Sequence, residues 1–230
     1  MSLILQIETA TTVCSVAIAR DGKILAFEQV NERNLHSAVI TRFMEDMTAS
    51  LGIAFNDLDA VAVSCGPGSY TGLRIGISTA KGLCFALDKP LIAIETLQAM
   101  AYGVINNEDH QLEPGTLLCP MIDARRMEVY TAIFKLDGTQ IKPTAAEIID
   151  ENSFSDLLKS NKILFFGDGA DKCEDVLGVN ANAQFLNGFT NSATYLTTKA
   201  FEKFQNRQFE DVAYFEPYYL KDFIAGKKGV

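Results

Sequence analysis

The residues best placed for chemistry form a glycine-rich turn between an apolar run and a helical segment. The turn follows the apolar run 60–63 and contains Gly66, Pro67, Gly68, Ser69 and Thr71. Glycines at the end of a strand permit close backbone approach, and the following helix points unpaired N–H groups and its positive dipole end outward. The turn could therefore contact an anion or a nucleotide. A tight turn in which Ser69 or Thr71 caps the helix explains the residues equally well.

Small residues recur inside the helix that follows the turn. Gly72, Gly76 and Ala80 are four residues apart and form one narrow face. Each interior glycine costs about 1 kcal/mol of helix propensity relative to alanine, so a compensating close contact is expected. That contact could be made by the chain's own sheet or by a helix of another subunit.

Other polar residues admit a structural and a functional interpretation. A hydrogen bond at the start of a helix explains His36 better than catalysis does. Asp123, Arg125 and Glu128 could form a recognition patch, but a turn stabilised by an arginine–carboxylate pair is equally natural. The glycine-rich segment 167–169 is interpreted only as a turn.

The elements that must position these residues follow from hydrophobic periodicity. In the first half the pattern predicts the order βββαβαβα, with strands at 3–7, 13–19, 23–29, 60–63 and 91–94 and helices at 36–51, 70–87 and 96–104. The second half loosely repeats it, with strands at 117–122, 129–135, 147–149 and 163–166 and helices at 170–177 and 192–204. We therefore expect two lobes, 1–104 and 105–230, and the last helix and tail are candidates to return to the first lobe.

Composition excludes several classes of protein. Of the 230 residues 48% are hydrophobic, which is enough for a sizeable core. A net charge of −9 disfavours tight nucleic-acid binding by the chain alone. The five widely spaced cysteines are expected to be buried free thiols, because an odd number cannot complete a disulfide framework. No run of about 18 apolar residues and no secretory signal pattern is present, so a cytoplasmic location away from membranes is expected.

Four motifs together carry a family resemblance. They are IETA at 7–10, GPGSYTGLRIG at 66–76, DAR at 123–125 and EVY at 128–130. In these motifs the chain resembles the TsaB family, also called YeaZ, over essentially its whole length. The resemblance implies an α/β fold like that of actin, with two similar βββαβα-type lobes. It also implies a role in making the threonylcarbamoyl modification of the adenosine beside the tRNA anticodon.

In that family TsaB pairs with TsaD, the catalytic subunit, so the resemblance implies a non-catalytic scaffold that binds and activates TsaD. Homodimers are expected when TsaD is absent, TsaE is a possible further partner, and tRNA is contacted only through the complex. The expected partner interface lies on the helices 36–51 and 70–87. It comprises His36, Ile40, Phe43, Met47, Gly72, Ile75, Gly76, Thr79 and Ala80.

The resemblance also implies which groups this chain has lost. TsaD carries an HxxxH metal pair on the helix after the short strand, where this chain has Thr96 and Met100, so no metal is expected. Related kinases have a D-x-G-T turn in the first hairpin, whereas Ala10 replaces the glycine here and its Cβ would restrict phosphate approach. No catalytic residue is therefore assigned. The alternatives are a metal-dependent glycoprotease-like peptidase or an ATP-dependent small-molecule kinase, and ATP or ADP at a subunit interface is the candidate ligand.

Overall fold

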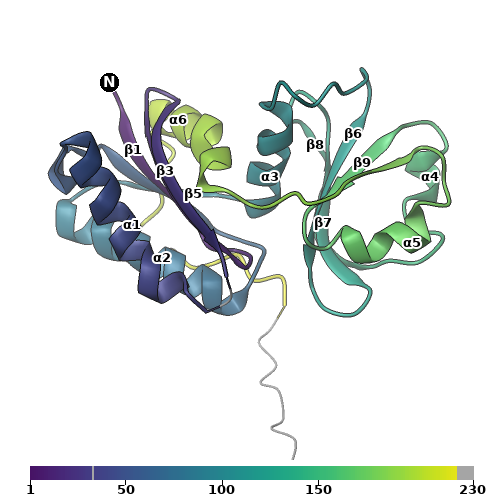
Figure 1. The fold of residues 1–230 in the computed structure, drawn as a ribbon, viewed down its shortest axis with the longest axis horizontal. Helices are drawn as coiled ribbons and strands as arrows, with labels where there is room; N and C mark the ends of the chain where they lie inside the picture. Colours follow the sequence, from purple (N-terminus) through teal and green to yellow (C-terminus); the bar gives the residue numbers. More distant parts are fainter. Residues whose placement is uncertain (33, 222–230) are drawn as a thin grey trace, which may run out of the picture.

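A computed structural model describes residues 1–32 and 34–221, and its chain forms two five-stranded sheets side by side (Figure 1). The first sheet has the order β3-β2-β1-β4-β5. Its strands are β1 (Leu3–Glu8), β2 (Val13–Arg20), β3 (Lys23–Asn31), β4 (Ala60–Ser64) and β5 (Leu91–Ile94). β1, β2 and β3 form an antiparallel meander, and β4 and β5 run parallel to β1. A parallel neighbour needs a crossover, and here a helix supplies each one.

The two crossover helices cover one face of the first sheet. They are α1 (His36–Leu51) and α2 (Tyr70–Leu87), and a short 3-10 helix, η1 (Phe55–Asp57), follows α1. Successive side chains of β1 point to opposite faces of the sheet. Leu5 packs with side chains of α1 and α2 on one face, and Ile4 packs with Leu196 on the other. Figure 1 shows α1 and α2 together on one side of this sheet and α6 on the other.

The second sheet repeats the first with the order β10-β9-β6-β7-β8. Its strands are β6 (Leu117–Asp123), β7 (Glu128–Phe134), β8 (Gln140–Ile148), β9 (Ile163–Phe166) and β10 (Ala183–Leu186). β6, β7 and β8 are antiparallel, and β9 and β10 run parallel to β6. The predicted α/β fold with two similar lobes is therefore confirmed.

Helices also join the two lobes. α3 (Thr96–Ile105) packs its apolar side against β6 of the second sheet and also contacts the 3-10 helix η3 (Ala193–Leu196). η3 leads into α6 (Thr197–Gln205), which packs against β5 and β1. Beyond α6, Glu210 pairs with Leu91 at the edge of the first sheet. The last helix and the tail therefore return to the first lobe.

The second half departs from the sequence prediction in its smaller elements. β8 begins at Gln140, seven residues before the predicted strand, because this edge strand is only half covered and shows little apolar alternation. The predicted helix 170–177 is a 3-10 turn, η2 (Asp171–Cys173), followed by the short α5 (Glu174–Leu177). The predicted helix 192–204 begins as η3. α4 (Ser155–Leu158) and β10 were not predicted, because four residues are too few to show a period and neither has the continuous apolar run that marks β5 and β9.

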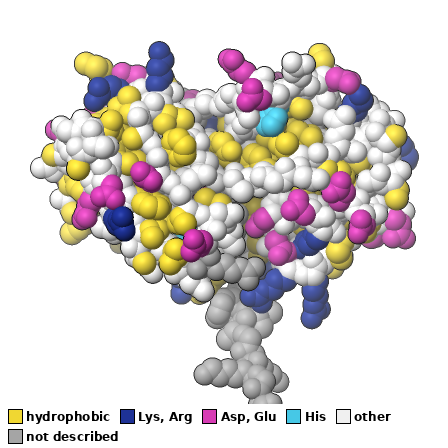
Figure 2. Space-filling model, in the orientation of Figure 1, with side chains coloured by type: hydrophobic (Ala, Val, Ile, Leu, Met, Phe, Trp, Pro, Cys, Tyr) yellow, Lys and Arg dark blue, Asp and Glu magenta, His cyan; other side chains and the backbone are white. Residues whose placement is uncertain are grey.

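The other general expectations concern thiols, charge and membranes. All five cysteines are free and buried, as predicted. Acidic side chains are spread over both lobes on the face shown in Figure 2, in keeping with the net charge of −9. Within residues 1–32 and 34–221, no helix combines the length and the apolar character that crossing a membrane requires.

Candidate functional site

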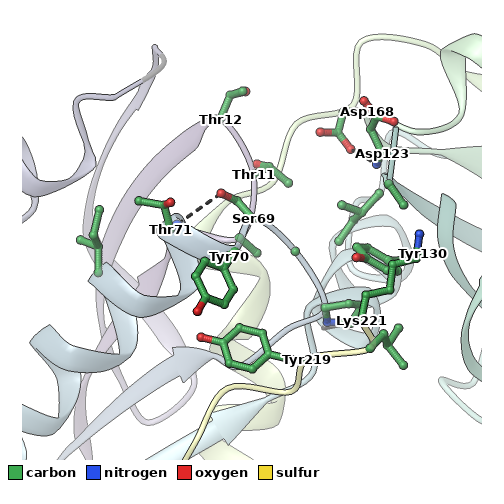
Figure 3. A pocket seen from close by; sticks show the side chains of 18 of the residues that line it. Thr11, Thr12, Ser69, Tyr70, Thr71, Asp123, Tyr130, Asp168, Tyr219 and Lys221 are labelled. Atoms are coloured by element: carbon green, nitrogen blue, oxygen red, sulfur yellow. Dashed lines mark hydrogen bonds between the residues drawn. The ribbon is translucent and has the colours of Figure 1, made fainter. Parts of the chain in front are cut away.

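A cleft of about 940 Å³ lies between the two lobes. The first lobe contributes the β1–β2 turn and the start of α2, and the second lobe contributes the end of β6 and the turn after β9. The tail at residues 218–221 closes a further side. Figure 3 shows these groups facing one another, among them Thr11, Ser69, Tyr70, Asp123, Asp168 and Tyr219.

Several backbone N–H groups of the glycine-rich turn already donate hydrogen bonds to other parts of the chain. Ser69 caps α2, because its hydroxyl accepts a hydrogen bond of 3.2 Å from the Gly72 N–H. The Ser69 N–H donates to the Ala10 carbonyl at 2.6 Å. The Gly66 N–H donates to the Thr96 hydroxyl at 3.1 Å. These three donors are no longer available to an anion, so the predicted anion contact stays a prediction that rests on the remaining N–H groups.

Both glycines of the turn are required by neighbouring backbone. A Cβ on Gly68 would lie 2.5 Å from the Ala10 carbonyl oxygen, and one on Gly66 would lie 2.6 Å from the Tyr218 carbonyl oxygen. The backbone of Gly66 also has a φ of +117°, a conformation that residues with a side chain rarely adopt. The turn is therefore held between the first hairpin on one side and the tail on the other.

The small-residue face of α2 packs inside the chain. A Cβ on Gly72 would overlap the Thr9 carbonyl oxygen, and one on Gly76 would overlap the Thr9 hydroxyl. The close contact expected from these glycines is therefore made by the β1–β2 hairpin, and Ala80 is buried on the same face.

This packing corrects the list of residues expected to touch a partner. Within the chain the structure buries six of the nine, namely His36, Ile40, Met47, Gly72, Gly76 and Ala80. Phe43, Ile75 and Thr79 remain half-buried at the surface. The interface on α1 and α2 stays a prediction, and only its exposed residues could contact another protein directly.

His36 holds the first hairpin in place. Its buried Nε2 lies 3.0 Å from the Thr11 carbonyl oxygen and 3.2 Å from the Val13 carbonyl oxygen, so the Nε2–H donates to this turn. His36 also begins α1. The residue thus ties the start of the helix to the cleft wall, a structural role of the kind expected.

Glu8 is a buried carboxyl at the end of β1. Burial raises its pKa to about 7, and hydrogen bonds oppose that shift. The Ala10 N–H donates to its Oε1 at 2.6 Å. Ser64 and Asn191 also lower the pKa of Glu8, although the Ser64 hydroxyl and the Asn191 amide nitrogen make no hydrogen bond of normal geometry. Because the Ala10 carbonyl accepts a hydrogen bond from the Ser69 N–H, Glu8 stabilises the turn that lines the cleft without itself lining it.

The DAR motif and Tyr130 of the EVY motif line the second-lobe side of the cleft. The Arg125 N–H donates to Asp123 Oδ1 at 2.8 Å, and the Asp123 carboxylate pairs with Lys172. Glu128 pairs with Lys221 of the tail. The carboxylates thus pair with lysines, so the arginine–carboxylate pair considered from sequence is not what stabilises this turn. Arg125 takes a left-handed conformation with φ of 74°, and its exposed side chain borders the cleft.

Two parts of the site were missed by sequence reasoning. Asp168 belongs to the segment interpreted only as a turn, yet it lines the cleft and accepts a hydrogen bond of 3.0 Å from the Asp123 N–H. Its side chain is exposed toward the cleft, and partial desolvation by the protein around it is the largest cause that raises its pKa. An aspartate between two glycines at a strand end was the available signal.

The tail is the second missed part. The Tyr219 ring lies 5.1 Å from the Tyr70 ring, and Arg74 Nε donates to the Tyr219 hydroxyl at 3.1 Å. The Arg74 guanidinium also lies over the Tyr70 ring at 4.1 Å. The return of the tail to the first lobe was considered from the sequence, but no local pattern indicates that Tyr218 to Lys221 then line the cleft.

The two positions aligned with the metal pair of TsaD serve packing here. The Thr96 hydroxyl is buried and accepts from Gly66, as described above. Met100 belongs to the core between α3 and the second sheet, and its methyl group lies next to Gly167. In the part of the chain that the structure describes, no three His, Cys, Asp or Glu side chains are grouped as metal ligands.

Comparisons with known proteins agree with this geometry. Residues 30–221 match the family described as TsaD: tRNA N6-adenosine threonylcarbamoyltransferase. A curated Escherichia coli K12 protein, tRNA threonylcarbamoyladenosine biosynthesis protein TsaB, is 38% identical over 60% of this chain and 57% of its own length. The chain thus matches little more than half of that relative. A Bacillus subtilis protein of the same description is 29% identical over 76% of each chain.

A solved structure extends the likeness to the whole fold. It is YeaZ from Pseudomonas aeruginosa, which superposes with a TM-score of 0.80 at 25% identity and covers 96% of this chain and 100% of its own. Together with the curated relatives it confirms the resemblance to TsaB and YeaZ that the four motifs predicted.

Proposed function

The chain belongs to the family described as TsaD, tRNA N6-adenosine threonylcarbamoyltransferase, and from that premise we propose that it acts in threonylcarbamoyladenosine synthesis as a non-catalytic subunit. Its partner in this proposal is a TsaD-type enzyme, which it binds and activates. The curated relatives named for threonylcarbamoyladenosine biosynthesis support the pathway.

One observation carries the non-catalytic part of the proposal. Where the enzyme would hold its metal with two histidines, Thr96 supports the Gly66 turn and Met100 fills the core. Both side chains already have structural partners, so a metal could be held here only by dismantling that packing. On the first-lobe side of the cleft, the Ser69 N–H and the Ala10 carbonyl are likewise already hydrogen-bonded to each other.

The proposed docking surface is the solvent-facing side of α1 and α2. Phe43, Ile75 and Thr79 lie partly exposed on it, and Phe85 of α2 is 86% exposed. Hydrophobic side chains are visible among the charged ones in Figure 2 over the part of the first lobe where Figure 1 places these helices. A contiguous patch of exposed apolar side chains, in contrast to single ones, marks a surface that another protein covers, and these residues are offered as part of such a patch.

A matched pair of substitutions tests this surface. Ser78→Arg places a long charged side chain on the exposed side of α2, and Ser160→Arg makes the same change on the exposed surface of the second lobe. Both should leave the fold intact, because neither serine is buried. We expect Ser78→Arg to weaken binding to the TsaD-type enzyme by about tenfold or more, which corresponds to about 1.4 kcal/mol. Equal binding by both variants in titration calorimetry would remove this docking surface.

We also propose ATP or ADP as the ligand of the interlobe cleft when both subunits are present. The start of α2 borders the cleft, and the positive end of the helix dipole there supports an anionic ligand of this kind. Calorimetry with ADP on the chain alone and on the two-subunit complex tests this ligand. Absence of binding in both would exclude it.

A further inference from the structure

Residues 210–221, the part of the tail that the structure describes, form a continuous segment that we name the tail strap. It begins at Glu210, whose N–H donates to the Leu91 carbonyl at 2.9 Å and so extends the edge of the first sheet. Val212 and Phe215 then pack against the first-lobe core. Lys81 of α2 donates to the Phe215 carbonyl at 2.8 Å. This part of the tail strap is therefore fixed to the first lobe.

The tail strap next passes over the glycine-rich turn. The Tyr218 N–H donates to the Cys65 carbonyl at 2.8 Å, and the Tyr218 carbonyl lies where a side chain on Gly66 would be. Tyr219 then stacks near Tyr70 and receives the Arg74 hydrogen bond. Main-chain bonds thus hold the tail strap as far as the mouth of the cleft.

At its end the tail strap crosses to the second lobe. Lys221 pairs with Glu128 of β7, and its Nζ lies 5.9 Å from the centre of the Tyr130 ring. Figure 3 shows Tyr219 beside Tyr70 and Lys221 beside Tyr130, on the two sides of the cleft. The side chains of Lys221 and Glu128 are 38% and 25% exposed, so dissolved salt can screen their attraction.

The lobes are also joined away from the tail strap. There α3 packs on η3, and the Asn106 side chain donates to the Thr198 hydroxyl at 2.8 Å. The Thr144 hydroxyl donates to the Glu95 carboxylate at 3.1 Å. A packed connection of this kind can act as a hinge for small changes in the angle between lobes.

We propose that the tail strap is a latch across the interlobe cleft, in which the Lys221–Glu128 ion pair holds the two lobes at the observed spacing. Release of this pair leaves the strap attached to the first lobe and lets the second lobe swing about the α3–η3 connection. The latch does not depend on the proposed partner or on the proposed nucleotide. Opening would widen the access to Tyr130, Asp123 and Asp168, which already line the second-lobe side of the cleft.

The test measures the distance between lobes in the full-length chain. Thr41→Cys on α1 and Asp175→Cys on α5 place one spin label on the exposed surface of each lobe. The five native cysteines are buried, so the labels attach at the two introduced thiols. Pulsed electron spin resonance then compares the unchanged tail with Lys221→Arg, Lys221→Glu, Glu128→Lys and the double variant Lys221→Glu with Glu128→Lys.

We expect each single charge reversal to shift the ratio of open to closed lobes about two- to fivefold toward open, as the loss of a half-exposed ion pair would. Lys221→Arg and the double variant should keep the closed distribution, and 1 M salt should open the unchanged protein. Identical distributions in all variants would overturn the latch. So would an opening in Lys221→Glu that Glu128→Lys fails to reverse, because the change would then not come from this pair. Thermal unfolding of each variant confirms that it is folded.

Discussion

Glu8 shows that polar residues near the cleft have structural roles, because their hydrogen bonds hold the turns that line it. Its carboxyl binds the Ala10 N–H, and the Ala10 carbonyl binds the Ser69 N–H at the start of α2. His36 holds the same hairpin from the other side through Thr11. Residue types that could have served chemistry are therefore used to fix one turn against another.

The raised pKa of Glu8 predicts a pH-dependent stability. Because its pKa is about 7 in the folded chain and 4.5 in an ordinary environment, the folded state binds this proton more tightly. The resulting stabilisation is fully present below about pH 4.5 and is lost as the pH rises through 7. We expect the unfolding free energy, measured relative to Glu8→Gln, to fall by about 2 to 3 kcal/mol between pH 5 and pH 8.

Urea unfolding of both proteins at the two pH values makes this comparison. Glu8→Gln is the matched variant because its amide has the size of the protonated acid and does not titrate. If the two proteins lost stability in parallel with rising pH, Glu8 would not be the titrating group.

At the scale of elements, the close contact between the β1–β2 hairpin and α2 restricts which residues α2 can carry where the two meet. Gly72 and Gly76 are required because Thr9 lies against the helix backbone. Gly82, two turns further along α2, has no atom within 4 Å of the position of a Cβ and is exposed. The same residue type in one helix therefore has two different environments.

This contrast predicts opposite effects for one substitution. Gly76→Ala should lower the unfolding free energy by about 1 to 3 kcal/mol, because the added methyl overlaps the Thr9 side chain. Gly82→Ala should raise it by up to about 1 kcal/mol, because alanine favours the helix and meets nothing there. Chemical denaturation of the two variants measures both. A stabilising Gly76→Ala would show that the hairpin does not pack as described.

Long elements with a buried apolar side could be predicted from the sequence, whereas the half-exposed edge strands of the second sheet could not. The helices α1 and α2 were predicted with their observed bounds, because each has a long apolar stripe that one sheet covers. The edge strands β8 and β10 were predicted poorly or not at all. Their side chains are mostly half-exposed or exposed, so no alternation of apolar and polar residues marks them.

At the scale of the whole molecule, the cleft combines parts that sequence could and could not predict. The Gly66 turn and Asp123 were found from motifs that lie next to strands. Tyr219 and Lys221 reach the cleft through the return of the tail, which depends on how the two lobes pack. Prediction from one sequence is weakest for such contacts, because no local period or spacing encodes them.

We propose that this chain supports a catalytic partner and performs no reaction itself. The most direct test of this proposal is threonylcarbamoyl transfer to unmodified tRNA in the presence of a threonylcarbamoyl donor. It is measured with the purified chain, with the TsaD-type enzyme of the same organism, and with both. We predict no modification by the chain alone, and modification at least about tenfold faster with both proteins than with the enzyme alone. Modification by the chain alone, or an enzyme whose rate does not change when the chain is added, would contradict the account.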